Sequence, residues 1–262
     1  MVYMNLQRIA LVIEFDGHAF SGWQRQPNAP SVQQTLESAL AAIDGCRREL
    51  MTAGRTDAGV HARAMLVHAD VSAERWHRAP RAYLHGLNAH LPPTVRVIGL
   101  KKVAADFHAR FDCLERAYCY QIWNRTTLSA LDRWRHWWMP RALDIDAMYE
   151  ASRYALGRHD FSALRASGCQ AHSPVREIRD IRIDREGYCI RIEVRADAFL
   201  YRMVRNLVGN LVEVGLGKRS PGNFAELLAS RDRTRGAATA PAQGLYFTDA
   251  VYADFRASEL IG

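Results

Sequence analysis

The stretch Gly54-Arg55-Thr56-Asp57-Ala58-Gly59-Val60-His61 lies between two short apolar runs, residues 50–53 and 64–67. Apolar runs on both sides of a glycine-containing stretch predict two strands joined by a loop. The two glycines allow this loop to turn tightly and to approach a ligand closely. One carboxylate is gathered there with a guanidinium, a hydroxyl and an imidazole, which predicts a chemical role. The alternative is a surface turn in which Asp57 bonds its own backbone.

The first half of the chain alternates strands and helices around this loop. We expect a strand over residues 4–15 and a helix after Ser31, which forms a capping box with Gln34. Strands flank the Asp57 loop, a second helix ends at Pro92, and a further strand covers residues 95–103. The predicted order is β-α-β-β-α-β.

The second half repeats that order. The expected elements are a strand over 116–123, a helix from 144 to 157, a hairpin of 175–184 and 188–196, helices over 199–214 and 224–228, and a last strand over 245–252. Two halves of this kind predict an α+β fold made of two ferredoxin-like subdomains. Their expected bounds are residues 1–106, which hold the Asp57 loop, and residues 107–262.

The composition restricts the class of protein and its partners. A chain of 262 residues suffices for a buried core without disulfides or a structural metal. Five scattered cysteines favour a reducing compartment, and residues 1–8 show no apolar signal segment, so we expect a cytoplasmic protein that does not enter a membrane. The net charge of +7, with arginine in excess, suits a polyanionic partner. The alternative is dispersed charge on an ordinary basic protein.

The Asp57 loop resembles, residue for residue, the catalytic loop of the tRNA pseudouridine synthase A family. Other segments match in the family's order and extend the resemblance over nearly the whole chain: Phe15-Asp16-Gly17, 22–26, 107–111, 116–120, 159–161, 203–206 and 244–246. The set is specific, although any one segment alone is weak. Leu164 departs from the pattern, because the family often has an aromatic there, and residues 126–139 have no match.

The resemblance implies two ferredoxin-like subdomains with antiparallel sheets that face a central basic cleft. It also implies isomerisation of uridine to pseudouridine at positions 38, 39 and/or 40 of the tRNA anticodon stem-loop, by a homodimer that holds the tRNA jointly. The reaction breaks a C1′–N1 bond and forms a C1′–C5 bond without net redox change. The sequence has no phosphate-binding glycine loop and no metal-ligand spacing, so we expect no cofactor and no metal.

Three residues carry the chemistry that the resemblance implies. Asp57 is the catalytic carboxylate, and the residues leave open whether it adds to the base, attacks C1′ or deprotonates C2′. Arg205, on a polar stripe of its helix, is the cation that lowers the pKa of Asp57; the alternative for that stripe is a solvated face. Tyr118 stacks on the flipped uracil and moves a proton at C5, and its alternative role is core packing.

The remaining predicted site residues bind substrate. With Tyr118 they are Gly54, Arg55, Thr56, His61, Gln24, Arg25, Arg110, Arg202 and Leu245. Arg55 is expected to grip phosphate or help to extrude the base, and His61 to support its loop or touch RNA. The run Arg133-Trp134-Arg135-His136-Trp137-Trp138 interleaves basic and aromatic residues as an RNA platform would. We expect it to fill a core or an interface instead.

Three other functions remain open from the residues alone. The first is a pseudouridine synthase for a different RNA. The second is an RNA-binding or chaperone module in which Asp57 is only structural. The third is a basic, metal-independent hydrolase.

Overall fold

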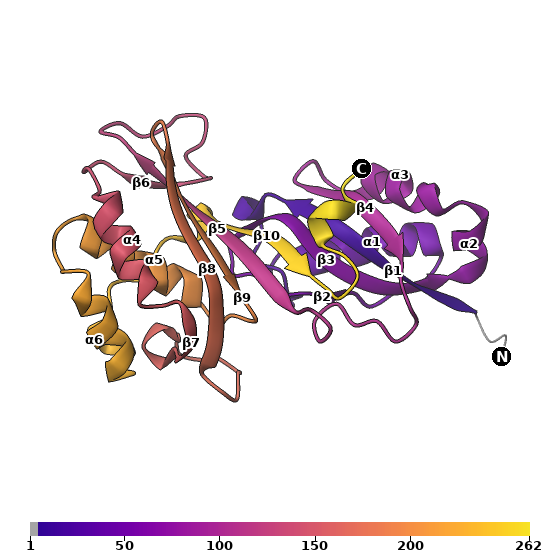
Figure 1. The fold of residues 1–262 in the computed structure, drawn as a ribbon. Helices are drawn as coiled ribbons and strands as arrows, with labels where there is room; N and C mark the ends of the chain where they lie inside the picture. The colour runs from indigo at the N-terminus through magenta and orange to yellow at the C-terminus, as the bar shows by residue number, and fades with distance from the viewer. Residues whose placement is uncertain (1–4) are drawn as a thin grey trace. The chain divides into compact units, whose positions relative to one another are not determined.

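The computed structural model of the chain describes residues 5–262 (Figure 1). Two compact units make up the chain: residues up to 114 together with 247–262, and residues 115–246. Met4, the first residue of the predicted first strand, and the first half of segment 1–8 lie outside the described residues. None of the helices within residues 5–262 is long and apolar enough to cross a membrane.

The first unit is built on a sheet in the order β4-β1-β3-β10, with β2 paired to β3. Its strands are β1 (Leu6–Phe15), β2 (Met51–Thr52), β3 (His61–Ser72), β4 (Val95–Lys102) and β10 (Leu245–Val251). β1 lies antiparallel between β3 and β4. Because it is a central strand, its middle residues 9–13 are all buried. The short β2 and the start of β3 carry the two ends of the Asp57 loop.

Three helices accompany this sheet: α1 (Val32–Asp44), α2 (Ala73–Arg78) and α3 (Pro80–His90). One of the two bonds of the predicted capping box is recorded, because the Ser31 hydroxyl accepts the Gln34 N–H at 3.3 Å. α1 ends at Gly45, whose φ of 79° is left-handed. α2 was not predicted, because six residues are too few to show a helical period.

Residues 260–262 lie against β4 at the edge of this sheet. Gly99 forms an antiparallel bridge with Ile261, and the Gly262 N–H donates to the Ile98 carbonyl at 3.3 Å. A β-carbon at Gly99 would lie 2.1 Å from the Leu260 carbonyl oxygen. A glycine is therefore required for this backbone to lie so close to β4.

The second unit holds a sheet in the order β5-β9-β8-β7, with β6 parallel to β5. Its elements are β5 (Glu115–Asn124), β6 (Trp137–Met139), α4 (Ile145–Arg153), β7 (Gly157–Asp160), β8 (Val175–Glu186), β9 (Cys189–Ala196), α5 (Met203–Gly215) and α6 (Gly222–Ser230). Figure 1 shows the three helices together beside the strands, with α4 against β8 and α5 against β5. The predicted hairpin is confirmed as β8 and β9.

Several details of the second unit differ from expectation. β6 and β7 were missed because they have three and four residues, and the helix predicted to run to residue 157 ends at Arg153, before β7. The helix predicted from residue 199 begins at Met203, because Arg202 has a left-handed φ of 58° that interrupts helical geometry. α6 extends the predicted 224–228 segment by two residues at each end.

The predicted α+β class is confirmed, with mostly antiparallel strand pairing. The ferredoxin-like subdomains, the basic cleft and the bounds 1–106 and 107–262 stay predictions. The compact units divide at residue 114, and residues 247–262 join the first unit because β10 lies beside β3 in its sheet.

A buried carboxylate links the helices of the first unit. The Asp44 side chain, which has no exposed area, accepts hydrogen bonds from Arg48 Nε at 2.5 Å, the Ser72 N–H at 2.9 Å and the Tyr83 hydroxyl at 2.7 Å. These donors come from the segment after α1, from Ser72 at the start of α2, where it is the N-cap, and from α3, while Asp44 itself ends α1. Burial, and then the bond to Asp44, raise the pKa of Tyr83 well above its usual value.

Replacing Tyr83 by Phe keeps the ring and removes one donor to Asp44. Because the lost bond reaches a charged acceptor, we expect the free energy of unfolding to fall by about 1.5–3 kcal/mol. Urea denaturation followed by circular dichroism measures this change. Tyr149→Phe is the control, since this side chain is 48% exposed and surface changes stay within about 0.5 kcal/mol. Unchanged stability of Tyr83→Phe would mean that the buried bond contributes nothing.

Candidate active site

The Asp57 loop is held by the segment that follows β1. The Trp23 N–H donates to the Thr56 carbonyl at 3.1 Å, and the Gly59 N–H donates to the Phe20 carbonyl at 3.4 Å. A turn closes the loop itself, because the Val60 N–H donates to the Asp57 carbonyl at 3.2 Å. Two segments distant in sequence therefore form one backbone assembly around Asp57.

Glycines allow these two segments to touch. A β-carbon at Gly17 would lie 2.0 Å from the Val60 carbonyl oxygen, and one at Gly22 would lie 2.7 Å from the Thr56 carbonyl oxygen. Gly22 and Gly59 also have left-handed φ angles of 101° and 78°. Side chains at these positions would push the loop away or strain it. The predicted tight turn around Asp57 is therefore present.

His61 lies beneath the loop and is only 2% exposed. Its Nδ1 accepts the Gly17 N–H at 3.0 Å and lies 3.2 Å from Asp16 Oδ1. Of the two roles predicted for His61, this geometry favours support of the loop.

The side chains around Asp57 differ in their access to solvent. Asp57 is half-buried and Arg55 is exposed. Thr56 is 8% exposed, and its buried hydroxyl has no hydrogen-bond partner among the described residues. The half-buried Gly54 precedes them, and its carbonyl accepts the Thr52 hydroxyl at 3.0 Å. The carboxylate thus directly follows an exposed cation and a buried hydroxyl along the loop.

Gln24 and Arg25 lie next to the same segment and differ in their contacts. Arg25 forms an ion pair with Glu37 of α1, which is 3% exposed. Its N–H also donates to the Gln33 side chain at 3.2 Å. Gln24 is exposed and lines a hollow of about 520 Å³ together with Arg25. Arg25 is therefore engaged in fixing its segment to α1.

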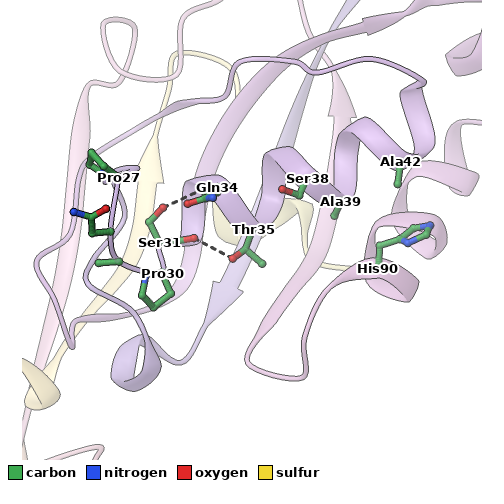
Figure 2. Close-up of a pocket in the computed structure, with 11 residues that line it drawn as sticks. Pro27, Pro30, Ser31, Gln34, Thr35, Ser38, Ala39, Ala42 and His90 are labelled. Atoms are coloured by element: carbon green, nitrogen blue, oxygen red, sulfur yellow. Dashed lines mark hydrogen bonds between the residues drawn. The ribbon is translucent and has the colours of Figure 1, made fainter.

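A second hollow of the first unit contains none of the predicted site residues. Figure 2 shows its lining from α1, the preceding turn and His90, with Thr35 and Gln34 bonded to Ser31. Its volume is about 630 Å³. The presence of a hollow by itself therefore does not distinguish the Asp57 loop from other parts of the first unit.

Arg110 lies in the segment after β4 and is exposed. Its guanidinium is 5.8 Å from the centre of the Phe111 ring, which is 76% exposed. Its N–H donates to His108 Nδ1 at 3.1 Å, so the backbone at Arg110 is fixed while the side chain faces solvent.

The second unit carries Tyr118 on β5. This residue is 9% exposed, and its ring meets Phe199 edge-on at 5.0 Å. Tyr120, two residues along, is fully buried and its hydroxyl donates to the Pro241 carbonyl at 2.8 Å. Burial raises the pKa of Tyr120 well above its usual value, against a smaller opposite effect of the Arg205 charge. The burial of Tyr118 also fits the alternative of core packing.

Arg205 lies on α5 among side chains that are buried. Its Nε donates to the Ala240 carbonyl at 2.7 Å. Asn206 and Asn210 of the same stripe are 0% and 2% exposed. The alternative of a solvated face is therefore wrong for these asparagines, because residues 236–241 cover them. The sequence analysis did not predict this covering segment. The signal for it is the helical spacing of residues 206, 209 and 210, because small and polar residues on one helix face allow another backbone segment to pack there.

Two other predicted substrate-binding residues lie at opposite extremes of exposure. Arg202 is exposed before α5, with its guanidinium 4.9 Å from the Tyr201 ring centre. Leu245, the first residue of β10, is 6% exposed. The exposed guanidinium of Arg202 can therefore contact a substrate directly. Leu245 can do so only through the small part of its surface that is exposed.

The basic and aromatic run at 133–138 is divided in the structure. Trp137 packs edge-on against Tyr120 with ring centres 6.2 Å apart, as the core prediction requires. Trp134 and Trp138 are 47% and 38% exposed, so they fill no core within this chain, and their place in an interface stays a prediction. Arg133 lies over Trp134, with 5.6 Å between guanidinium and ring centre.

Within residues 5–262, no three His, Cys, Asp or Glu side chains come together as ligands for a metal ion.

Comparison with known proteins identifies the family. A family model described as tRNA pseudouridine synthase matches residues 11–112 and 151–253, which include Asp57 and Arg205 but not Tyr118. The tRNA pseudouridine synthase A of Rhodospirillum centenum is 47% identical over 248 residues, covering 94% of this chain and 100% of that protein. The proteins of the same name from Chromobacterium violaceum and Blochmanniella pennsylvanica are 47% and 44% identical, each covering 94% of both chains.

A solved structure, the crystal structure of a Cbf5-Nop10-Gar1 complex, aligns with a TM-score of 0.36 and 11% identity over 91% of this chain and 57% of that chain. A similarity at this TM-score and identity is too low to assign a fold or a function. The family model and the relatives agree over most of the sequence. This chain belongs to the tRNA pseudouridine synthase family.

Proposed function

We propose that this chain isomerises uridine to pseudouridine at positions 38, 39 and/or 40 of the tRNA anticodon stem-loop, with Asp57 as the catalytic carboxylate. Family membership supports the reaction and the tRNA substrate. The observation that carries the assignment of Asp57 is its loop, which holds one half-buried carboxylate and packs against Gly17 and Gly22 of the facing segment, with His61 buried beside it. Mapping pseudouridines in tRNA treated with the purified protein tests the function and its positions.

The reaction requires an ionised carboxylate. The C1′–N1 bond breaks, a C1′–C5 bond forms, and the proton lost from C5 is balanced by one gained at N1. A charged carboxylate acts by attack on the nucleotide or by removal of a sugar proton. The target base must leave its stack to meet Asp57, as other enzymes that modify bases require. No cofactor is needed for a rearrangement without net redox change or hydrolysis.

Arg205 is proposed as the cation that keeps Asp57 ionised. A carboxylate in a desolvated pocket tends to take up a proton, and a nearby positive charge opposes this by lowering its pKa. The half-buried position of Arg205 and its bond to the Ala240 carbonyl support a guanidinium held in one place. Such a group can face a carboxylate with little loss of side-chain entropy.

Tyr118 is proposed to stack on the extruded uracil and to move the proton at C5. Its ring lies on a strand and is fixed by Phe199, which supports a rigid stacking surface. The exposed Arg55, Gln24, Arg110 and Arg202 are proposed to bind the RNA backbone. The proposed role of Arg25 is secondary to its ion pair with Glu37, and Gly54, Thr56, His61 and Leu245 would shape the pocket.

The proposed assembly is a homodimer that holds one tRNA jointly, as the family resemblance implies. The proposed location is the cytoplasm, where five free cysteines stay reduced and tRNA is available.

Replacing Asp57 by Asn keeps the size of the side chain but removes its charge and its nucleophilic oxygen. We expect no detectable isomerisation, while tRNA binding stays within about threefold of the parent because affinity comes from basic contacts elsewhere. Pseudouridine mapping and a filter-binding assay measure the two properties. Conversion at about a hundredth of the parent rate or faster would exclude a catalytic role for Asp57. Surviving activity would instead favour a structural aspartate.

Replacing Tyr118 by Phe keeps the ring and deletes the hydroxyl. If the hydroxyl handles the C5 proton, kcat should fall by about 10²-fold or more while tRNA binding persists. Single-turnover assays on tRNA measure this. Tyr154→Phe is the control, since this tyrosine is 43% exposed and belongs to no predicted site. A Tyr118→Phe variant at the full parent rate would reduce Tyr118 to a stacking surface.

Replacing Arg205 by Met should leave the half-buried Asp57 carboxylate without its proposed cation. A carboxylate that loses a neighbouring positive charge takes up a proton more readily. The ionised fraction of Asp57 then falls near neutral pH and recovers as the pH increases. We therefore expect Arg205→Met to lose activity near pH 7 and to regain part of it at higher pH.

The parent should change much less over the same range, because its aspartate is already ionised. Arg205→Lys should be milder, since it retains a positive charge without the planar fork. pH–rate profiles of the three proteins measure these effects. A Met variant whose profile overlays that of the parent would show that Arg205 does not act on Asp57.

A further inference from the structure

Residues 236–241 cross α5 as irregular backbone outside the named helices and strands; we call them the strap. Buried backbone of this kind must find its hydrogen bonds outside a helix or a sheet. The Ala237 N–H donates to Asn210 Oδ1 at 2.9 Å, and the Ala240 N–H donates to the Arg205 carbonyl at 3.1 Å. The Tyr120 hydroxyl donates to the Pro241 carbonyl at 2.8 Å. The strap is therefore fixed at both ends within its unit.

The backbone of the strap lies so close to α5 that the helix has no room for a side chain at Gly209. A β-carbon at Gly209 would lie 2.1 Å from the Ala238 carbonyl oxygen. Any larger residue at 209 would lift the strap from the helix. The polar stripe of α5 is thus the surface on which the strap packs.

Asn206 stands at the centre of this surface and has no exposed area. Its Oδ1 accepts the Thr239 hydroxyl at 2.6 Å and an Arg233 terminal nitrogen at 3.0 Å. Its Nδ2 donates to the Leu164 carbonyl at 2.8 Å. Arg233 also donates to the Ala237 carbonyl at 2.8 Å. One amide side chain therefore holds the strap, the loop before it and the neighbouring 3₁₀ turn (Ser162–Leu164) together.

We propose that Asn206 and Thr239 are positioning residues for Arg205. Their hydrogen bond holds the strap on α5, next to Ala240, whose carbonyl accepts Arg205 Nε at 2.7 Å. Because a guanidinium is planar, a fixed Nε restricts the directions in which its terminal nitrogens point. The inference rests on the proposed role of Arg205 beside Asp57 and adds the device that orients it.

The test is Thr239→Val, which removes the hydroxyl with little change of shape, compared with Thr239→Ser, which keeps it. Misplacement of a charged group by a fraction of an ångström lowers the rate without weakening binding, so we expect kcat to fall about tenfold for Val. The KM for tRNA should stay within about twofold of the parent, and the Ser variant should lose less than about threefold. Thr239→Ala provides the same readout should the Val variant not fold.

A variant in the other unit separates positioning from loss of stability. Tyr83→Phe is the stability control, because it also removes a single hydroxyl donor but lies in the other unit. It should lower Tm comparably, by about 2–4 °C per kcal/mol, with kcat unchanged. A tenfold loss of kcat in Tyr83→Phe as well would overturn the proposal.

A double-mutant cycle tests whether Thr239 acts through Arg205. Lysine has no Nε at the position that the Ala240 carbonyl accepts from, so Thr239→Val should cost less than about twofold in an Arg205→Lys background. Equal losses in both backgrounds, or an unchanged kcat in the parent background, would overturn the proposal. Arg205→Lys and Arg205→Met alone report on the role of Arg205 itself. If Arg205 does not act on Asp57, these two single variants show it. If Arg205 acts but the strap does not orient it, only the Thr239 variants show no effect.

Discussion

Backbone that lies outside helices and sheets must still satisfy its N–H and C=O groups, and both candidate regions of this chain depend on that requirement. The Asp57 loop meets it with the Phe20 carbonyl, the Trp23 N–H and, through Gly17, the ring of His61. The strap meets it with side chains of α5. In each case a glycine allows the contact, and a buried side chain with a ring nitrogen or an amide completes it.

Buried carboxylates in the first unit serve a different purpose from that proposed for Asp57. Asp44 and Glu37 are 4% and 3% exposed, and each is surrounded by donors that join helices or fix a segment. Asp57 is half-buried at the end of a loop. A carboxylate that only holds structure can be enclosed completely, whereas one that reacts must remain accessible to a base. Burial thus separates structural from chemical candidates more clearly than residue type does.

Much of the fold followed from local pattern in the sequence. Ser31 and Gly45 mark the ends of α1, and alternation of buried residues at 190, 192, 194 and 196 marks β9. These signals lie within one element, so a single sequence reveals them. The division of the units was harder, because β10 joins a sheet whose other strands lie far away in sequence.

The sequence indicated residues for the candidate site but not the contacts between them. Asp57, Gly17 and Gly22 stood out in sequence, yet the pairing of Gly22 with the Thr56 carbonyl is a tertiary contact. The polar stripe of α5 was noticed, but its covering segment begins more than 20 residues after the helix ends. The exposure of Trp134 and Trp138 was also not predicted, since composition does not distinguish a core aromatic from a surface one.

The placement of residues 260–262 against β4 has a consequence for association between copies of the chain. β4 ends the strand order of its sheet, and an open edge strand offers a row of backbone groups for pairing with another chain. The bridge between Gly99 and Ile261 occupies part of that row. Copies of the protein therefore meet a covered strand at this edge, which disfavours runaway sheet extension and aggregation there.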